Sequence, residues 1–463
     1  MKTSPTVAIW WIRRDLRLAD NQALQQALSS AEQVLPLFIL DPVLLKSERT
    51  STRRVDFMLA GLRALDADLQ RKGSRLILRH GEPLKVLTEL KQEMDFQAIF
   101  AEEDFSAYAR QRDDSVAALF DLHLCGGLTV LPPSLTVKAD GSPYTIFTPY
   151  SKTWRENYQQ PQLLPEPGKI ASPTEVFSEA LPEPPIDLNT PFAMAGAPEA
   201  QRRLERFFAA RIQNYASDRD RMDLEGTSSL SPYLRFGMLS ARQMVNAAIS
   251  GISEAGSQQN AHGAKVWLNE LIWREFFYSV LFHFPQVQKD SFRPELRNIH
   301  WLNREEDFSA WKEGRTGYPI VDAAMRQLRS TGWMHNRARM IVASFLTKDL
   351  LIDWRWGEKY FMQQLLDGDV AANNGGWQWS AGTGTDAAPY FRIFNPVLQG
   401  QKFDPNGEYI RRWVPELRLL PVPLVHQPWT SPAELARMGV SYFDPIVDHA
   451  LARGRCLLAY KGE

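Results

Sequence analysis

The sequence has little of several features that mark particular classes of protein. It contains only 2 cysteines among 463 residues, so neither a disulfide framework nor a cysteine-built metal site is expected. No apolar run approaches the roughly 20 residues that span a bilayer. Residues 1–7 lack the apolar core of a signal peptide. These absences predict a cytoplasmic protein that does not associate with membranes.

Net charge is also nearly absent, whereas aromatic residues are abundant. The 53 basic and 54 acidic residues give a formal net charge of −1, so any DNA site must be a local basic patch. The chain has 14 tryptophans, and 11% of its residues are aromatic. That excess indicates stacking or electron transfer, although core packing explains any single tryptophan.

The length and the periodicity predict two domains joined by a linker. Residues 1–131 alternate short apolar runs with amphipathic stretches, which predicts an α/β domain with a parallel, doubly wound sheet. Residues 132–198 are proline-rich and predict an ordered linker, and residues 199–463 predict a mostly α domain. Within the first domain, strands are expected at 7–12, 34–40, 76–78, 99–101 and 128–131, and a helix at 55–72, closed by Gly73.

A predicted helix at residues 266–284, stopped by Pro285, carries a mixed stripe. Glu270, Trp273, Arg274 and Phe277 fall at i, i+3, i+4 and i+7 and therefore share one face. A buried stripe with an internal Glu270–Arg274 ion pair is the ordinary explanation. The same residues would also suit a nucleobase, which needs a stacking face and hydrogen-bond partners.

A second pair of helices begins at Pro319 and breaks at Gly332. After the break, Asn336, Arg339 and Met340 share a face with the small Ala343, which would leave room for a flat ligand. Arginine and asparagine in the first turns of a helix are nevertheless common on ordinary surfaces.

Residues 367–379 combine two acids, two amides, two glycines and two indoles, which suit neither a core nor a helix. The segment is predicted to be a conformationally demanding loop that serves a site; an incidental turn is the alternative. Asp367 and Asp369 have a spacing that could hold a metal ion. No metal is expected, because no histidine follows at ligand spacing and nearby arginines compete for the carboxylates.

Tyr215 precedes a hydroxyl-rich loop at residues 227–231. Hydroxyls and backbone N–H groups near the start of a helix suit a diphosphate, although ordinary N-capping accounts for the same residues.

Residues 266–277, 317–353 and 367–394, together with Arg13 to Leu18, closely resemble bacterial class I cyclobutane-dimer DNA photolyases of the photolyase/cryptochrome family. The resemblance extends over nearly the whole chain. It implies an α/β antenna domain followed by a helical FAD domain. It also implies light-driven repair, in which excited reduced FAD passes an electron to a pyrimidine dimer flipped out of DNA, the two bonds joining the pyrimidines break, and the electron returns.

The resemblance also assigns roles to residues. The FAD contacts would be Tyr215, Thr227, Ser228, Ser229, Leu230, Ser231, Trp267, Arg274, Arg339, Asp367, Gly368, Asp369 and Asn373, with Arg339 paired to Asp367 and Asn373 beside flavin N5. The catalytic set would be Glu270, Trp273, Asn336, Met340, Asn373 and Trp379, and the electron path Trp377, Trp354 and Trp301. DNA contacts would come from Arg219, Glu270, Trp273, Arg274, Phe277, Asn336, Arg337, Gln399 and Lys402.

The second chromophore is expected to be 8-hydroxydeazaflavin rather than 5,10-methenyltetrahydrofolate. Folate-antenna relatives carry an Asn-Glu pair where this chain has Tyr108 and Ala109, although Lys289 matches their folate-side lysine. The antenna residues would be Asp104, Tyr108, Arg110 and Arg235.

The protein is expected to be a monomer. Two other functions are alternatives to dimer repair. A (6-4) photolyase or a cryptochrome-type blue-light photoreceptor is the first, but (6-4) enzymes have a histidine where Asn336 stands, and many signalling relatives have an acid or cysteine in place of Asn373. The second is a flavin electron carrier with no role on DNA, which would not need Glu270, Trp273 and Trp379 to converge on one pocket.

Overall fold

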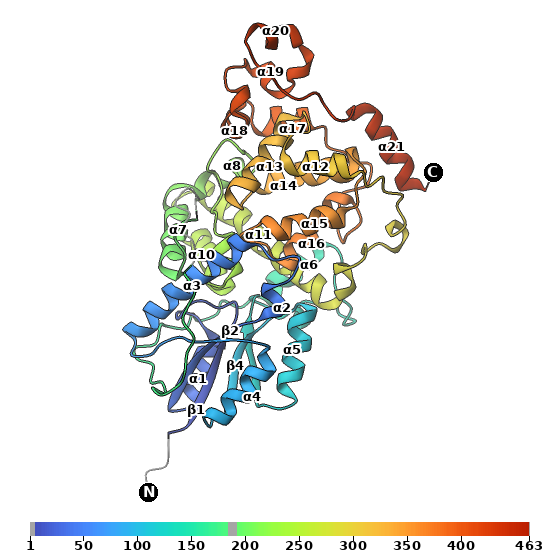
Figure 1. Cartoon of the computed structure of the whole chain (residues 1–463). Coiled ribbons are helices and arrows are strands. Elements are labelled where there is room, and N and C mark those ends of the chain that lie inside the picture. The colour runs from blue at the N-terminus through green and yellow to red at the C-terminus, as the bar shows by residue number, and fades with distance from the viewer. Residues whose placement is uncertain (1–4, 184–191, 463) are drawn as a thin grey trace. The chain divides into compact units, whose positions relative to one another are not determined.

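The computed structural model describes residues 5–183 and 192–462 (Figure 1). The chain divides into two compact units. Unit 1 is Met1–Gln213 with Ser228–Pro285, and unit 2 is Asn214–Thr227 with Gln286–Glu463. These units differ from the three-part division at residues 131 and 198, which stays a prediction. Part of the predicted linker, residues 184–191, lies outside the described residues.

Unit 1 contains a five-stranded sheet in the order β3-β2-β1-β4-β5, and all of its strand pairs are parallel. The strands are β1 (Val7–Ile12), β2 (Gln33–Leu40), β3 (Ile77–His80), β4 (Ala98–Glu103) and β5 (Leu122–Gly127). The predicted α/β class is therefore confirmed. Because β1 pairs with both β2 and β4, the topological switch point lies between β1 and β4.

The prediction of the fifth strand at residues 128–131 is wrong. The strand is Leu122–Gly127, where an exposed edge and two terminal glycines conceal the apolar pattern. The backbone N–H groups of Val130 and Leu131 donate instead to the Glu275 carboxylate, at 2.6 and 3.4 Å. The residues expected to form a strand therefore tether the chain to a helix.

The helices of unit 1 fall between and after the strands. They are α1 (Gln22–Ser30), α2 (Pro42–Leu45), α3 (Thr52–Arg71), α4 (Pro83–Glu93), α5 (Ala107–Ala117), α6 (Phe147–Asn157), α7 (Ala197–Ala210), α9 (Ser231–Arg235), α10 (Ala241–Ser253) and α11 (Gln258–His283). Gly73 follows α3 with φ 81°, in agreement with the predicted closure. The helix α6 lies inside the proline-rich stretch, where the sequence predicts only a linker.

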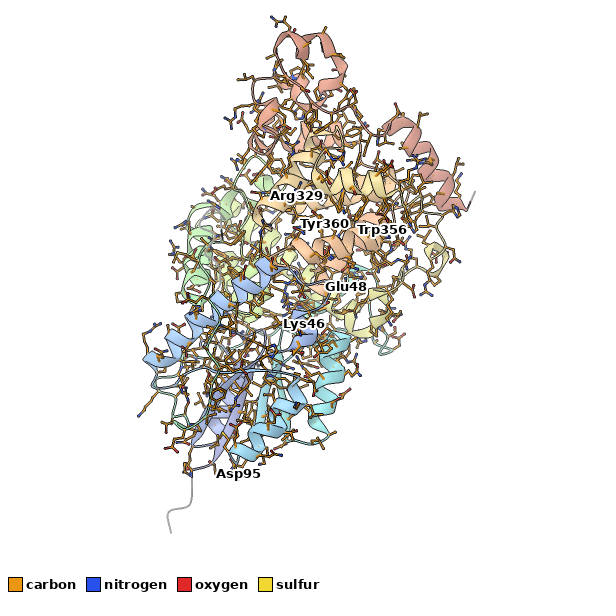
Figure 2. The ribbon with its side chains drawn as sticks, in the orientation of Figure 1. Lys46, Glu48, Asp95, Arg329, Trp356 and Tyr360 are labelled. Atoms are coloured by element: carbon orange, nitrogen blue, oxygen red, sulfur yellow. The ribbon has the colours of Figure 1, made fainter. Side chains whose placement is uncertain are left out.

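Unit 2 is built from helices, which confirms the mostly α class of this part. They are α8 (Tyr215–Asp218), α12 (Glu305–Glu313), α13 (Pro319–Thr331), α14 (Asn336–Ser344), the π-helix η5 (Phe345–Asp349), α15 (Trp354–Gln364), α16 (Val370–Ala381), α17 (Pro396–Phe403), α18 (Glu408–Trp413), α19 (Val422–His426), α20 (Pro432–Arg437) and α21 (His449–Lys461). Trp356 and Tyr360 of α15 pack against the main core cluster of this unit (Figure 2). Within the described ranges, none of the helices is long and apolar enough to span a membrane.

The prediction of a loop at residues 367–379 is also wrong, because most of this segment belongs to α16. Asp369 caps the helix by accepting hydrogen bonds from the N–H groups of Ala371 and Ala372, at 3.0 and 3.2 Å. The side chains of Asn373 and Asn374 donate to acceptors outside the helix. They therefore do not compete for the backbone of α16, which removes the usual objection to asparagine in a helix.

Candidate functional site

In unit 1, the predicted site residues of α11 lie in an aromatic cluster. The Trp273 ring stacks on Phe147, with ring centroids 3.7 Å apart and planes 5° apart. Trp267 is buried and lies against Phe207, with centroids 5.3 Å apart. The helix that carries the predicted stripe is confirmed as part of α11 (Gln258–His283). Trp267, which lies outside the stripe, is packed as a core residue within its own unit, and its contact with FAD stays a prediction.

Arg274 and the neighbouring Glu275 fasten α11 within unit 1. The Arg274 guanidinium donates a hydrogen bond to the Leu128 backbone oxygen and lies 4.7 Å from the centroid of the Tyr278 ring on the same helix. The buried Glu275 carboxylate accepts a hydrogen bond from the Trp154 indole N–H at 2.6 Å, in addition to the backbone donors at Val130 and Leu131. Burial raises the pKa of Glu275, and these donors oppose that shift. No local pattern in the sequence marks this role of Glu275.

The hydroxyl-rich residues of unit 1 lead into α9. Ser229 has φ 52°, in the left-handed region that serine rarely adopts. Leu230 is buried, and α9 begins at Ser231. A strained serine is maintained only where its surroundings fix it, which suits a loop that holds a ligand.

The remaining residues that the sequence connects with this loop lie in unit 2. Tyr215 is buried at the start of α8. The Arg219 guanidinium lies 6.0 Å from the centroid of the Tyr215 ring. Thr227 belongs to the same unit and is buried less deeply than Tyr215.

Within unit 2, Arg339 and Asp367 form the predicted pair, with Nη2 2.7 Å from Oδ2. The other carboxylate oxygen of Asp367, Oδ1, is buried and has no hydrogen-bond partner among the described residues. A buried acceptor of this kind calls for a donor from a water molecule or a ligand. Flavin N–H and ribityl O–H groups supply such donors, so the residues present here fit FAD.

Asn373 is oriented by Glu358, a buried residue of α15. The Asn373 amide nitrogen donates to the backbone oxygen of Glu358 at 3.0 Å and to Oε1 of its side chain at 2.9 Å. The amide oxygen is then the atom of Asn373 that can serve a ligand, as an acceptor. Sequence reasoning missed Glu358, because nothing in the local pattern marks it.

A cavity of about 750 Å³ in unit 2 brings several predicted residues together. Of the predicted residues, Arg337, Met340, Trp379, Gln399 and Lys402 line it; Ser217, Asp220, Arg221, Arg392, Phe394 and Phe403 also line it and were not predicted. The exposed Asn336 is on α14, and its amide lies 4.0 Å from the Met340 sulfur. The cavity combines apolar stacking surface with cationic side chains.

The three tryptophans of the predicted electron path lie in or against one core cluster of unit 2. Trp377 and Trp354 are buried in this cluster, and the partly exposed Trp301 packs against it. Across the ranges that the structure describes, the Trp377 indole N–H is buried without a hydrogen-bond partner. Two of the three tryptophans are thus buried and the third is partly exposed; their role as an electron path stays a prediction.

The predicted antenna residues of unit 1 differ in their immediate contacts. Arg14 pairs with Asp104 at 3.1 Å and donates to the backbone oxygen of Arg235 at 3.2 Å, beside the ends of β1 and β4. Burial raises the pKa of Asp104, but Arg14, the Ser106 N–H and further arginines outweigh it and lower the pKa to about 2.

Two predicted antenna residues have other surroundings. Burial raises the pKa of Tyr108, and the hydrogen bond that its hydroxyl donates to the Asp41 carboxylate raises it further. Arg110 instead lines a separate surface cavity of about 540 Å³ with Pro285.

Comparison with known proteins agrees with this architecture. Residues 8–168 match the DNA photolyase profile, and residues 267–462 match that of the FAD binding domain of DNA photolyase. The deoxyribodipyrimidine photo-lyases of Vibrio cholerae and Escherichia coli are 42% and 41% identical to the chain, over 97% and 98% of it and 98% of each relative.

Solved structures agree as well. A class III photolyase from Agrobacterium tumefaciens superposes with a TM-score of 0.91 at 35% identity, covering 100% of this chain and 98% of the other. A Synechocystis cryptochrome gives a TM-score of 0.89 at 29% identity, covering 99% of each chain. The fold and the site define an FAD-binding flavoprotein. The chain belongs to the photolyase/cryptochrome family.

Proposed function

We propose that this chain catalyses the light-dependent repair of cyclobutane pyrimidine dimers in DNA. The observation that carries the proposal is the cavity of unit 2, where Trp379 and Met340 offer apolar surface beside the cationic Arg337 and Lys402. A flipped-out pyrimidine pair needs a stacking surface, and its flanking phosphates need cations. Relatives about 40% identical to the chain bear the name deoxyribodipyrimidine photo-lyase.

FAD would supply the photochemistry, and the protein would position and polarise it. In unit 2, Tyr215, Thr227, Arg339, Asp367, Gly368, Asp369 and Asn373 are the proposed contacts; in unit 1 they are Ser228 to Ser231, Trp267 and Arg274. Asp367 Oδ1, which has no partner among the described residues, would accept a hydrogen bond from the cofactor. Asn373 would lie beside flavin N5, with its amide oxygen available as an acceptor because its amide nitrogen donates to Glu358. Glu358 keeps that oxygen in place.

The dimer would be held by aromatic and polar side chains. On α11, Trp273 provides a stacking wall and Glu270 bonds the polar edge of a pyrimidine. In unit 2, Trp379 provides a second stacking surface, and Asn336 and Met340 form the floor. Arg219, Arg337, Gln399 and Lys402 contact the DNA backbone. The protein acts as a cytoplasmic monomer.

We further propose 8-hydroxydeazaflavin as the antenna, at the switch point between β1 and β4, where ligands of open parallel sheets bind. The Arg14–Asp104 pair and Arg235 lie there. An absorption spectrum of the purified protein before and after denaturation tests this, because released flavin, deazaflavin and folate differ in colour. A released folate spectrum would replace the deazaflavin assignment.

The activity itself is tested with defined lesions. Illuminated protein should restore thymine dimers in single-stranded and double-stranded DNA and leave (6-4) products unchanged, because Asn336 and Met340 supply no imidazole to the pocket floor. Repair of (6-4) products at a comparable rate would instead support the (6-4) photolyase alternative. Binding of FAD without repair of either lesion would support a cryptochrome-type photoreceptor.

A further inference from the structure

Phe147 and Trp273 are 126 residues apart in the sequence (273 minus 147), yet their rings lie face to face, 3.7 Å between centroids and 5° between planes. At this separation the rings overlap almost completely. Aromatic pairs left to themselves prefer offset or edge-to-face arrangements. The elements that carry the two rings therefore impose the stack.

The helix α6 supplies that constraint. Phe147 is its first residue. Trp154 lies about two turns later, and its indole N–H donates the 2.6 Å hydrogen bond to Glu275 of α11. Phe276 of α11 meets both rings edge-on, with centroids 5.9 Å from Phe147 and 5.7 Å from Trp273. Phe147 is only 6% exposed, so it lies behind the indole, whereas Trp273 remains half-buried.

We propose that Phe147 is a positioning residue for lesion recognition, which fixes the plane of the Trp273 indole so that its other face forms a rigid wall for the pyrimidine dimer. The inference rests on the proposed function of Trp273. If the Trp273 ring is already fixed in the free protein, it loses no side-chain conformational entropy when the lesion stacks on it. Preorganisation of this kind increases affinity without adding a contact.

The role predicts a loss of binding rather than of chemistry. Phe147→Leu keeps most of the buried apolar volume but removes the flat backing, so affinity for dimer-containing DNA should fall about fivefold, a part of what one base stacked on an aromatic ring contributes. Affinity for undamaged DNA, FAD content and the repair yield per bound dimer should stay at wild-type values. Phe147→Tyr retains the ring and should retain affinity.

A double-mutant cycle with Trp273→Ala separates this role from a general structural one. If Phe147 acts through the indole, Phe147→Leu should weaken binding in the wild-type background and have no further effect when Trp273 is already alanine. Phe96→Leu, which removes another buried ring of unit 1, controls for loss of core packing and should leave lesion affinity unchanged.

The outcomes are distinguishable. Wild-type affinity in Trp273→Ala would overturn the proposed function of Trp273 itself. Weak binding by Trp273→Ala together with wild-type affinity in Phe147→Leu would overturn the role of Phe147 and leave that of Trp273 intact. The positioning role of Phe147 would also be overturned if Phe147→Leu reduced the affinity for dimer-containing DNA equally with Trp273 and with alanine at position 273. The same holds if Phe147→Leu reduced the affinity for undamaged DNA as much as that for dimer-containing DNA, because Phe147 would then act on the fold as a whole.

Discussion

Trp377 is closely enclosed by α15. Only 2% of its surface is exposed, and a Cβ at Gly357 would lie 2.1 Å from its Cη2 atom. We expect Trp377→Phe to abolish photoreduction of oxidised flavin, because phenylalanine is much harder to oxidise than an indole. Repair by chemically reduced enzyme should survive, since the repair electron passes directly from flavin to dimer. Flavin bleaching under light with an external reductant, followed by a repair assay after dithionite treatment, measures both activities.

Trp311 provides the matched control. It is fully buried, and its ring centroid lies 6.1 Å from that of Trp377, but it is not part of the proposed path. Either substitution by phenylalanine should cost about 1–2 kcal/mol of stability. Retained bleaching in Trp311→Phe would show that lost packing does not stop photoreduction. Normal bleaching in Trp377→Phe would remove Trp377 from the path, and loss of both activities would place it in the repair step.

Glu358 should matter for FAD through Asn373. The substitution Glu358→Leu removes the carboxylate acceptor at 2.9 Å and allows the Asn373 amide to turn, so FAD affinity should fall about tenfold, the effect of one hydrogen bond to a charged group. Glu358→Gln keeps an oxygen acceptor and should lose much less. Titration of the apoprotein with FAD, followed by flavin fluorescence, compares the two. Equal affinities in both variants would mean that Glu358 does not orient Asn373.

At the scale of single residues, the sequence pointed to the residues proposed to contact ligands, but not to the residues that hold them in position. The family resemblance pointed to Asn373, Asp367 and Trp273 because these residues lie in the segments that resemble photolyases. Their partners Glu358 and Phe147 stand in no such run, and their contacts depend on how separate helices pack. Contacts of that kind follow from tertiary structure and leave no local periodicity to find.

The π-helix η5 carries a buried lysine side chain, Lys348, at a position where an apolar side chain is usual. Lys348 is 1% exposed, donates to the Ala381 backbone oxygen at 2.6 Å and lies 3.7 Å from the centroid of the Tyr460 ring. It thereby joins the end of α16 to α21. Desolvation lowers the pKa of Lys348 from its ordinary 10.5 to about 7, partly opposed by Cys456.

This pKa predicts a pH-dependent stability. Between about pH 7 and 10.5 the unfolded chain binds a proton at Lys348 that the folded chain does not, so the contribution of this group to stability rises with pH in that window. The free energy of unfolding of the wild type, relative to Lys348→Met, should therefore increase from about pH 7 to about pH 9. Urea unfolding at both values measures it. A constant difference would show that the amine keeps its ordinary pKa in the fold.

At the scale of elements, the sequence predicted the helices and strands whose apolar residues recur with a clear helical or strand period. The helix α13 begins at Pro319 and ends before Gly332, and four of the five strands fall near their predicted positions. The helix α16 was not recognised, because its polar residues satisfy one another only after folding: Asp369 caps the first turn and Asn374 reaches the backbone of Val287. The strand β5 was missed because its residues are mostly exposed.

At the scale of the whole molecule, near-neutrality makes local charge decisive for DNA. The net charge is −1, yet the cavity of unit 2 is lined by Arg221, Arg337, Arg392 and Lys402 against the single acid Asp220. Arg337 pairs with Asp220 at 2.9 Å, and its guanidinium lies 4.3 Å from the centroid of the Phe403 ring. These contacts hold a cation at the rim of the proposed lesion pocket without cancelling the excess of positive charge there.

The affinity for dimer-containing DNA should therefore fall steeply with salt, and the slope should report individual cations. Each phosphate contact contributes about 0.9 to the slope of log K against log salt, so Arg337→Ala and Lys402→Ala should each reduce it by about one. Arg437→Ala is the matched control, because Arg437 is an exposed arginine of α20, paired with Glu434 and outside the cavity lining, and its loss should leave the slope unchanged. Titrations at several salt concentrations give the slopes. A wild-type slope in Arg337→Ala would mean that Arg337 does not contact phosphate. A reduced slope in Arg437→Ala would mean that DNA is attracted by the charge of the whole surface rather than by this cavity.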